Sequence, residues 1–268
     1  MATGSVSTVD SAVGSAAQAG EAFASGAAMD VMGRRERGIA FLLAFCMSLG
    51  LAARALGPAL TAPEGWLVGS WMHPDCLSNH WLLAWVADRA ASLQGMLHNG
   101  DYYWPIGDAP VLAGNGTQGL AYLPFHLVWG WPGAVPRYLL VAMTLSGLGG
   151  YALARAAGAD PWSALLLPAL TVASPFVCGE LGAGRFSQAD TAPLLFFSAS
   201  WLWLLARPSS GRALLSASLL AFTSFFYWYY GFFGVLFGGV MVLVHGWRTL
   251  GIRVLVVFVA SFSAMIGP

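Results

Sequence analysis

The chain has 268 residues, of which 57% are hydrophobic and only 9% are charged, and its net charge is zero. An ordinary soluble domain carries roughly 25% charged residues, so this chain lacks the polar residues needed to cover a water-exposed surface. The composition therefore predicts an all-α polytopic membrane protein and excludes an ordinary soluble domain. Without a basic excess, we expect no nucleic-acid binding.

The N-terminal part predicts a tail followed by a first membrane helix. Residues 1–33 are rich in alanine, glycine and serine, and such a segment buries too little surface to order, which predicts a disordered cytoplasmic tail. Arg34, Arg35 and Arg37 then precede an apolar run over residues 38–57. This pattern is similar to a cleavable signal peptide, but further spans follow, so we expect an uncleaved transmembrane helix. The arginines place the N-terminus in the cytoplasm.

A large extracytoplasmic loop is expected over residues 58–119, which are too polar to lie in lipid. Within it, residues 77–97 repeat leucine, valine and tryptophan at helical spacing, with Asp88 and Arg89 elsewhere on the surface. This pattern predicts an amphipathic helix at the membrane interface. Residues 120–131 are apolar but short and contain proline, so they are expected to be re-entrant or interfacial.

Further apolar runs have the composition of membrane spans. They cover residues 136–154, 162–178, 191–206, 213–230, 231–247 and 251–268. The boundary near Tyr230 divides a run that exceeds the ~20 residues one helix needs to cross a bilayer. With the first helix, these runs predict about seven transmembrane helices within residues 34–268 and a second external loop over residues 179–190. Gly147, Gly149 and Gly150 would allow close helix packing in the second span.

Asp75 is the first candidate for chemistry, because scarce ionisable residues gather in the loop that contains it. It follows Pro74 at the start of the predicted helix, where it is a helix N-cap, a general base for an acceptor hydroxyl, or both. His73 could share a metal ion with it, but two ligands are too few to define a site. We therefore predict no metal ligands and place His73 with the substrate-binding residues.

Three further residues are assigned to substrate binding: Asp101, Arg185 and Gln188. Asp101 precedes an aromatic run and either ends an aromatic belt or faces a sugar or phosphate. Arg185 lies in the second external loop, where its guanidinium could hold a phosphate or pair with Glu180 or Asp190. The aromatic residues 225–233 are expected to face lipid or to pack between helices.

Several short motifs resemble membrane glycosyltransferases of the GT-C type. Asp75 precedes HWLLAWVAD (residues 80–88), and YWPIG follows at 103–107. GGYALAR at 149–155 and GRFSQ at 184–188 are similar to later parts of such enzymes. The resemblance covers roughly residues 38–208. It implies transfer of a sugar from a polyprenyl-phosphate donor to an acceptor on the outer face, with Asp75 as the base. Some members also bind a divalent cation.

The resemblance also implies an incomplete enzyme, because GT-C enzymes usually have more spans. We expect this chain to correspond to the N-terminal part of a larger multi-pass enzyme of the inner (plasma) membrane. A complementary C-terminal membrane segment and membrane lipid would then be its partners. Two rival interpretations are a non-catalytic transporter or flippase component and an inactive gene fragment.

Overall fold

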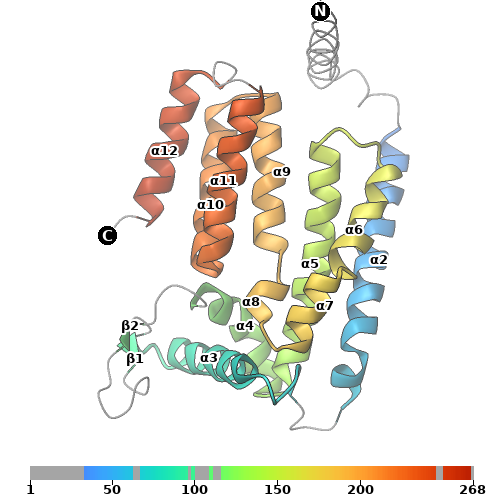
Figure 1. Ribbon diagram of the computed structural model, residues 1–268, viewed down its shortest axis with the longest axis vertical. Coiled ribbons are helices and arrows are strands. Elements are labelled where there is room, and N and C mark those ends of the chain that lie inside the picture. Colours follow the sequence, from blue (N-terminus) through green and yellow to red (C-terminus); the bar gives the residue numbers. More distant parts are fainter. Residues whose placement is uncertain are drawn as a thin grey trace, which may run out of the picture.

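The computed structural model describes residues 33–62, 67–95, 98–99, 109–110, 116–245 and 250–266. Within these ranges the chain is almost entirely helical (Figure 1). Two short strands, β1 (His98–Asn99) and β2 (Ala109–Pro110), pair antiparallel. Apart from this pair, the expected all-α architecture is confirmed for the described part of the chain. The expected tail over residues 1–33 lies outside it, except for Gly33.

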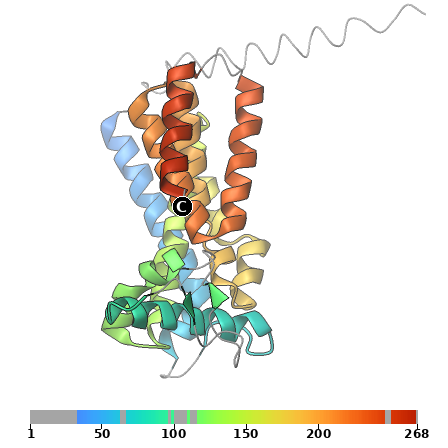
Figure 2. The ribbon, with the colours of Figure 1, turned by 90° about the vertical axis from the view of Figure 1, so that its left-hand side faces the viewer.

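The helices form a bundle with one helix lying across its end. They are α2 (Arg34–Thr61), α3 (Pro74–Ala91), α4 (Gly116–Trp129), α5 (Ala134–Ala156), the 3-10 turn η2 (Ser163–Leu165), α6 (Leu166–Val172), α7 (Pro175–Gly182), α8 (Phe186–Ala189), α9 (Ala192–Ala206), α10 (Ser210–Phe226), α11 (Trp228–His245) and α12 (Ile252–Ile266). In Figure 1, α2, α5, α9, α10, α11 and α12 run alongside one another, whereas α3 lies crosswise below them. Figure 2 shows α3 at the same end from a second direction.

Four helical stretches are long and apolar enough to cross a membrane: Arg35–Thr61, Ala134–Ala156, Ser163–Gly182 and Phe186–Ala206. Helices α11 and α12 are also apolar but shorter. A helix rises about 1.5 Å per residue, so the 15 residues of α12 fall short of a hydrocarbon layer about 30 Å thick. Helix length and composition therefore support a membrane protein with four such stretches in the described residues. The expectation of about seven spans goes beyond this number.

The crosswise helix α3 begins earlier and ends earlier than residues 77–97. His73 is its N-cap, with an extended backbone, and Pro74 occupies the first turn, where its fixed φ suits a helix start. The prediction that Asp75 caps the helix is therefore wrong, because Asp75 lies inside the first turn. The helix stops at Ala91, and Leu93 then takes a positive φ of 53°.

Three other predicted boundaries move. The expected span over residues 162–178 is divided between α6 and α7, because Ser174 caps a new helix that starts at Pro175. The expected loop over residues 179–190 contains the end of α7 and all of α8. The break in the long aromatic run falls at Tyr227, whose backbone is extended, and not at Tyr230. The expected division into two helices is nevertheless confirmed.

Small residues in α5 allow its neighbours to approach closely, as expected. A Cβ atom on Gly147 would lie 2.2 Å from the Ser48 hydroxyl of α2, and one on Gly149 would lie 2.9 Å from Leu195 of α9. A Cβ on Gly150 would lie 2.5 Å from the Thr171 hydroxyl of α6. Helix α5 is thus the centre of the bundle, and in a membrane such close contacts provide much of the packing energy.

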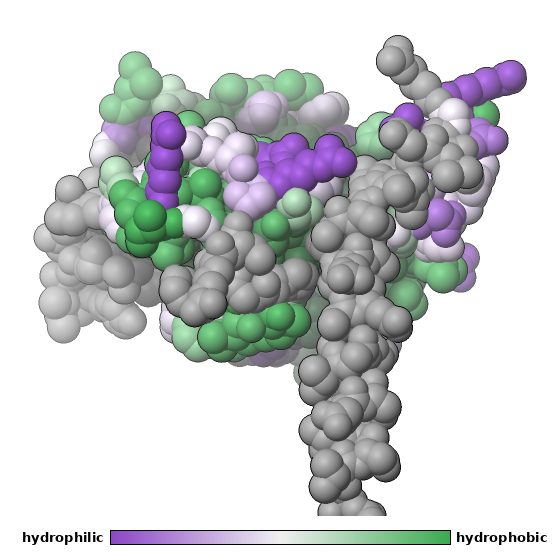
Figure 3. Space-filling model, turned by 90° about the horizontal axis from the view of Figure 1, so that it is seen from above, coloured by the Kyte–Doolittle hydropathy of each residue, from purple (hydrophilic) through white to green (hydrophobic). Residues whose placement is uncertain are grey.

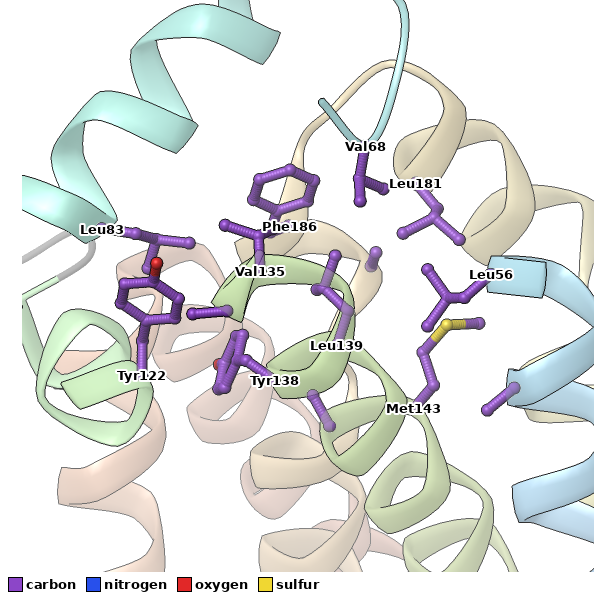
Figure 4. Packing of buried hydrophobic residues seen from close by; sticks show 14 of the residues in the cluster. Leu56, Val68, Leu83, Tyr122, Val135, Tyr138, Leu139, Met143, Leu181 and Phe186 are labelled. Atoms are coloured by element: carbon purple, nitrogen blue, oxygen red, sulfur yellow. The ribbon is translucent and has the colours of Figure 1, made fainter. Parts of the chain in front are cut away.

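A hydrophobic cluster joins α3, α4 and α8 to the bundle (Figure 4). Leu83 of α3 and Tyr122 of α4 contact one side of α5, and Phe186 of α8 lies beside them. Val68 and Leu181 extend the cluster toward α7. Burial of these side chains places the loop before α3 against the α7–α8 turn.

Arginines lie at both ends of the bundle. Figure 3, viewed from the end opposite α3, shows hydrophilic patches among hydrophobic side chains. Arg155 lies in the last turn of α5, and Arg207 and Arg212 lie at the junction of α9 and α10. Arg89 of α3 and Arg137 of α5 belong to the other end, where they stack over Trp85 and Trp129.

Candidate functional site

Four ionisable side chains meet where the start of α3 touches the α7–α8 turn, with Arg185 at the centre. Its Nε donates to Asp75 Oδ2 at 2.7 Å, and its Nη1 donates to Glu180 Oε2 at 3.2 Å. Its Nη2 lies 3.1 Å from His73 Nε2. We call His73, Asp75, Glu180 and Arg185 the Arg185 cluster.

Three separate elements supply these side chains. His73 and Asp75 belong to the cap and first turn of α3, Glu180 belongs to α7, and Arg185 is the residue before α8. The peptide dipoles at the start of α3 favour a carboxylate at Asp75. The contact between the start of α3 and the α7–α8 turn makes Arg185 and Asp75 neighbours, although 110 positions separate them in the chain.

Two glycines with positive φ allow the backbones to approach closely enough for this contact. Gly69 (φ 94°) would place a Cβ 2.7 Å from Gly184 Cα, and Gly184 (φ 74°) would place one 2.6 Å from Cys76 Cα. Ser70 N also donates to the Gly182 carbonyl at 2.7 Å. A side chain at either glycine would force the segment before Asp75 away from Arg185.

The Arg185 cluster is partly open to solvent. The side chains of Asp75, Arg185, His73 and Glu180 are 48%, 33%, 32% and 16% exposed, respectively. The hydrogen bond that Arg185 donates to Asp75 is the largest cause that raises the pKa of Arg185, followed by the one that it donates to Glu180. Because the ion pairs are accessible to water, they are of modest strength and a ligand can compete for them.

Two buried side chains hold the loop before α3 in place beneath this cluster. His80 is 1% exposed, its Nε2 lies 3.0 Å from the Val68 carbonyl oxygen, and its ring meets Phe186 edge-on. The Cys76 thiol donates to the same carbonyl at 3.3 Å. Burial lowers the pKa of His80, although its backbone hydrogen bond opposes the shift, and burial raises the pKa of Cys76. Burial thus favours the uncharged form of both side chains, which hold the loop through their contacts with the Val68 carbonyl.

The structure brings together three of the five predicted site residues: Asp75, His73 and Arg185. Gln188 lies one turn beyond Arg185 in α8, where its backbone carbonyl accepts a hydrogen bond from Tyr230. Asp101 lies outside the described residues. Of the two predicted partners of Arg185, Glu180 forms the pair, so Glu180 joins the site although it was not assigned to it.

Asp190, the other predicted partner of Arg185, is instead buried between helices. Its carboxylate accepts hydrogen bonds from Tyr138 at 3.3 Å, from Ser146 at 3.4 Å and from the backbone of Ala192 at 3.2 Å. It lies in the candidate span Phe186–Ala206. Sequence reasoning missed this polar contact with α5, and the only signal was an aspartate at the start of an apolar run.

The Arg185 cluster is not arranged as a metal site. Among the described residues, no group of three or more histidine, cysteine, aspartate or glutamate side chains could hold a metal ion. The Arg185 guanidinium itself contacts the imidazole and both carboxylates.

The comparisons with known proteins identify no relative. No family model, no curated protein and no solved structure matches the chain.

Proposed function

We propose that the chain is a membrane glycosyltransferase, or the N-terminal part of one, which transfers a sugar from a lipid-phosphate donor. The observation that carries the proposal is the contact between Asp75 and Arg185. It joins a carboxylate that can accept a proton and a guanidinium that can bind a phosphate within one partly open site. Substrate groups that react must share such a site.

The proposed step needs one proton transfer and one displacement. An acceptor hydroxyl gives its proton to Asp75, and its oxygen attacks the anomeric carbon of the sugar with inversion. The bond from that carbon to the phosphate oxygen breaks, and the lipid phosphate leaves with the electron pair. Arg185 contacts Asp75 only at Oδ2, which leaves Oδ1 for the acceptor. A guanidinium has five N–H groups, so two remain for phosphate beyond the three contacts.

The crosswise position of α3 supports a site at the membrane surface. Trp71, Met72, Leu77 and Trp81 are exposed apolar side chains on α3 or just before it. Tryptophan is enriched at membrane interfaces, and an amphipathic helix lies there in the plane of the bilayer. In the proposal, α3 is interfacial, the α3 end is extracytoplasmic, and about seven helices span the plasma membrane with the N-terminus in the cytoplasm.

Replacement of Asp75 tests the assignment. We expect Asp75→Asn to lower sugar transfer by about 10²–10⁴-fold, because loss of a general base has that effect. Asp88→Asn is the matched control, since Asp88 is on the same helix, 69% exposed, and outside the Arg185 cluster. The assay would follow radiolabelled sugar from a panel of polyprenyl-phosphate donors in membranes that contain the protein, with and without added divalent cation. Equal transfer by Asp75→Asn and the unchanged protein would remove Asp75 as the base.

A transporter or flippase component is the second candidate, and buried Asp190 is the observation that favours it. Ionisable residues inside membrane spans often mark a substrate or ion path. On this alternative, Asp190→Asn would abolish movement of a short-chain lipid-phosphate sugar across proteoliposome membranes, whereas Asp75→Asn would not. Flux that depends on neither residue would argue against transport through this bundle.

A further inference from the structure

Helix α4 buries polar atoms that have no hydrogen-bond partner among the described residues. They are both amide atoms of Gln118, the hydroxyl oxygen of Tyr122 and Nδ1 of His126. Gln118 and Tyr122 are each 0% exposed. The three residues follow one another at intervals of four positions, so their side chains lie along one face of the helix. We call Gln118, Tyr122 and His126 the α4 polar stripe.

Side-chain contacts join the α4 polar stripe to the surface at one end and to buried Asp190 at the other. His126 Nε2 lies 2.8 Å from Oδ1 of Asp88, whose side chain is 69% exposed. The Tyr122 ring contacts the rings of His126 and Tyr138, at centroid distances of 5.6 Å and 5.9 Å. The Tyr138 hydroxyl donates to Asp190 Oδ2 at 3.3 Å. The contacts therefore form a continuous series from the α3 end to Asp190.

Water is the ligand that suits the unpartnered atoms of the α4 polar stripe. A buried donor or acceptor without a partner is unfavourable, and ordered water commonly supplies the missing hydrogen bond. The Gln118 amide lies near the Tyr138 hydroxyl but beyond hydrogen-bond distance, so one water can bridge them. A neutral His126 donates from Nε2 to Asp88, because a carboxylate only accepts, and its Nδ1 lone pair then accepts from a second water.

Asp190 provides an exchangeable proton at the buried end of this series. It is 4% exposed, and among the described residues no arginine or histidine forms an ion pair with it. The titratable groups beside it are the hydroxyls of Tyr138 on α5 and Tyr230 on α11. A buried carboxylate without a positive partner is unfavourable, which favours a neutral carboxyl group. Ser146 can accept its proton, since the single hydroxyl hydrogen of Ser146 has a closer acceptor, the Ala142 carbonyl at 3.0 Å, than Asp190 at 3.4 Å.

We propose that the α4 polar stripe binds water and carries protons between the α3 end of the bundle and a protonated Asp190. Each water molecule and each tyrosine hydroxyl of the series accepts one proton and releases another, so every O–H bond that breaks is matched by one that forms. The Gln118 amide does not transfer a proton and holds the water in place. A proton that leaves Asp190 is replaced from solvent by the same path. This proton path does not involve the Arg185 cluster and goes beyond the proposed sugar transfer.

Rapid-mixing infrared spectroscopy of the protein in lipid nanodiscs tests the proton path. At pH 5, above the ordinary aspartate pKa of about 3.9, a protonated Asp190 gives a carbonyl band that Asp190→Asn removes and that D₂O shifts. Without a path, the shift would wait for local unfolding and would follow the exchange of buried backbone amides. We expect a shift at least about tenfold faster than that amide exchange in the unchanged protein. Tyr122→Phe and Gln118→Leu should slow the shift by about tenfold or more, because each removes partners of the bound water.

Tyr151→Phe is the matched control, because Tyr151 of α5 is 7% exposed but lies outside the series, and it should keep the fast shift. Slowing in either stripe variant supports the path. The proposal is overturned by any of three results: no band that Asp190→Asn removes, a shift as slow as amide exchange in the unchanged protein, or a fast shift in both stripe variants. Gln118→Met replaces Gln118→Leu if the leucine variant loses its thermal transition.

Discussion

His80 lies where a charged imidazole is unfavourable. Its side chain is buried against Phe186 and bound to the Val68 carbonyl, and burial lowers its pKa below the ordinary value of 6.5. In the unfolded chain the same imidazole titrates near its ordinary value. As the pH falls below about 6.5, the unfolded state therefore binds a proton that the folded state excludes, and stability decreases.

We expect the thermal unfolding midpoint in detergent to fall between pH 7.5 and pH 5, with part of the fall due to His80. His80→Gln retains an N–H donor for Val68 but does not titrate, so its midpoint should fall less over the same range. Identical pH dependence in the unchanged protein and His80→Gln would contradict this account.

At the scale of elements, the contact between the start of α3 and the α7–α8 turn decides whether the Arg185 cluster exists. That contact depends on Gly69 and Gly184, because both have positive φ and both would place a Cβ within 2.7 Å of a backbone carbon. Gly179 of α7 differs, since a Cβ there would meet nothing within 4 Å. The two kinds of glycine provide a matched comparison.

Gly184→Ala should destabilise the protein by about 1–3 kcal/mol, the usual cost of a strained backbone position. It should also open the contact with α3, so that a maleimide labels the buried Cys76 faster in a protein whose Cys46 and Cys178 are replaced by alanine. Gly179→Ala should leave both the midpoint and the labelling rate nearly unchanged. Similar behaviour of the two variants would show that close packing at Gly184 is unimportant.

At the scale of the whole molecule, the two ends of the bundle differ in structure. One end carries α3 and the Arg185 cluster, and the other carries the junction of α9 and α10 (Figure 1). The proposed topology places these ends on opposite faces of the membrane. This arrangement can be tested without any knowledge of the substrate.

In a cysteine-free background, Asp88→Cys should react from outside intact cells with a membrane-impermeant maleimide. Arg212→Cys, at the half-buried position in the first turn of α10, should react only after the membrane is permeabilised. The readout is the labelled fraction of each protein before and after permeabilisation. Labelling of both cysteines from the same side would exclude the proposed orientation of the bundle.

Much of the architecture follows from local properties of the sequence. Long apolar runs predict helices in a membrane, and glycines spaced along α5 predict close packing, because both depend on residues near one another in the chain. Exact helix ends were less predictable. Pro74 and Ser174 start helices at positions that apolar periodicity alone does not mark.

The sequence by itself determined the membrane class, the helical composition and the short set of residues able to perform chemistry. Only the tertiary structure decided that Arg185 pairs with Asp75 and Glu180, while Asp190 turns to Tyr138. The physical reason is that these pairings depend on a turn at Gly184 and on the packing of α3 against α7 and α8. Those contacts join residues distant in the chain, and no local pattern of hydrophobicity or charge encodes them.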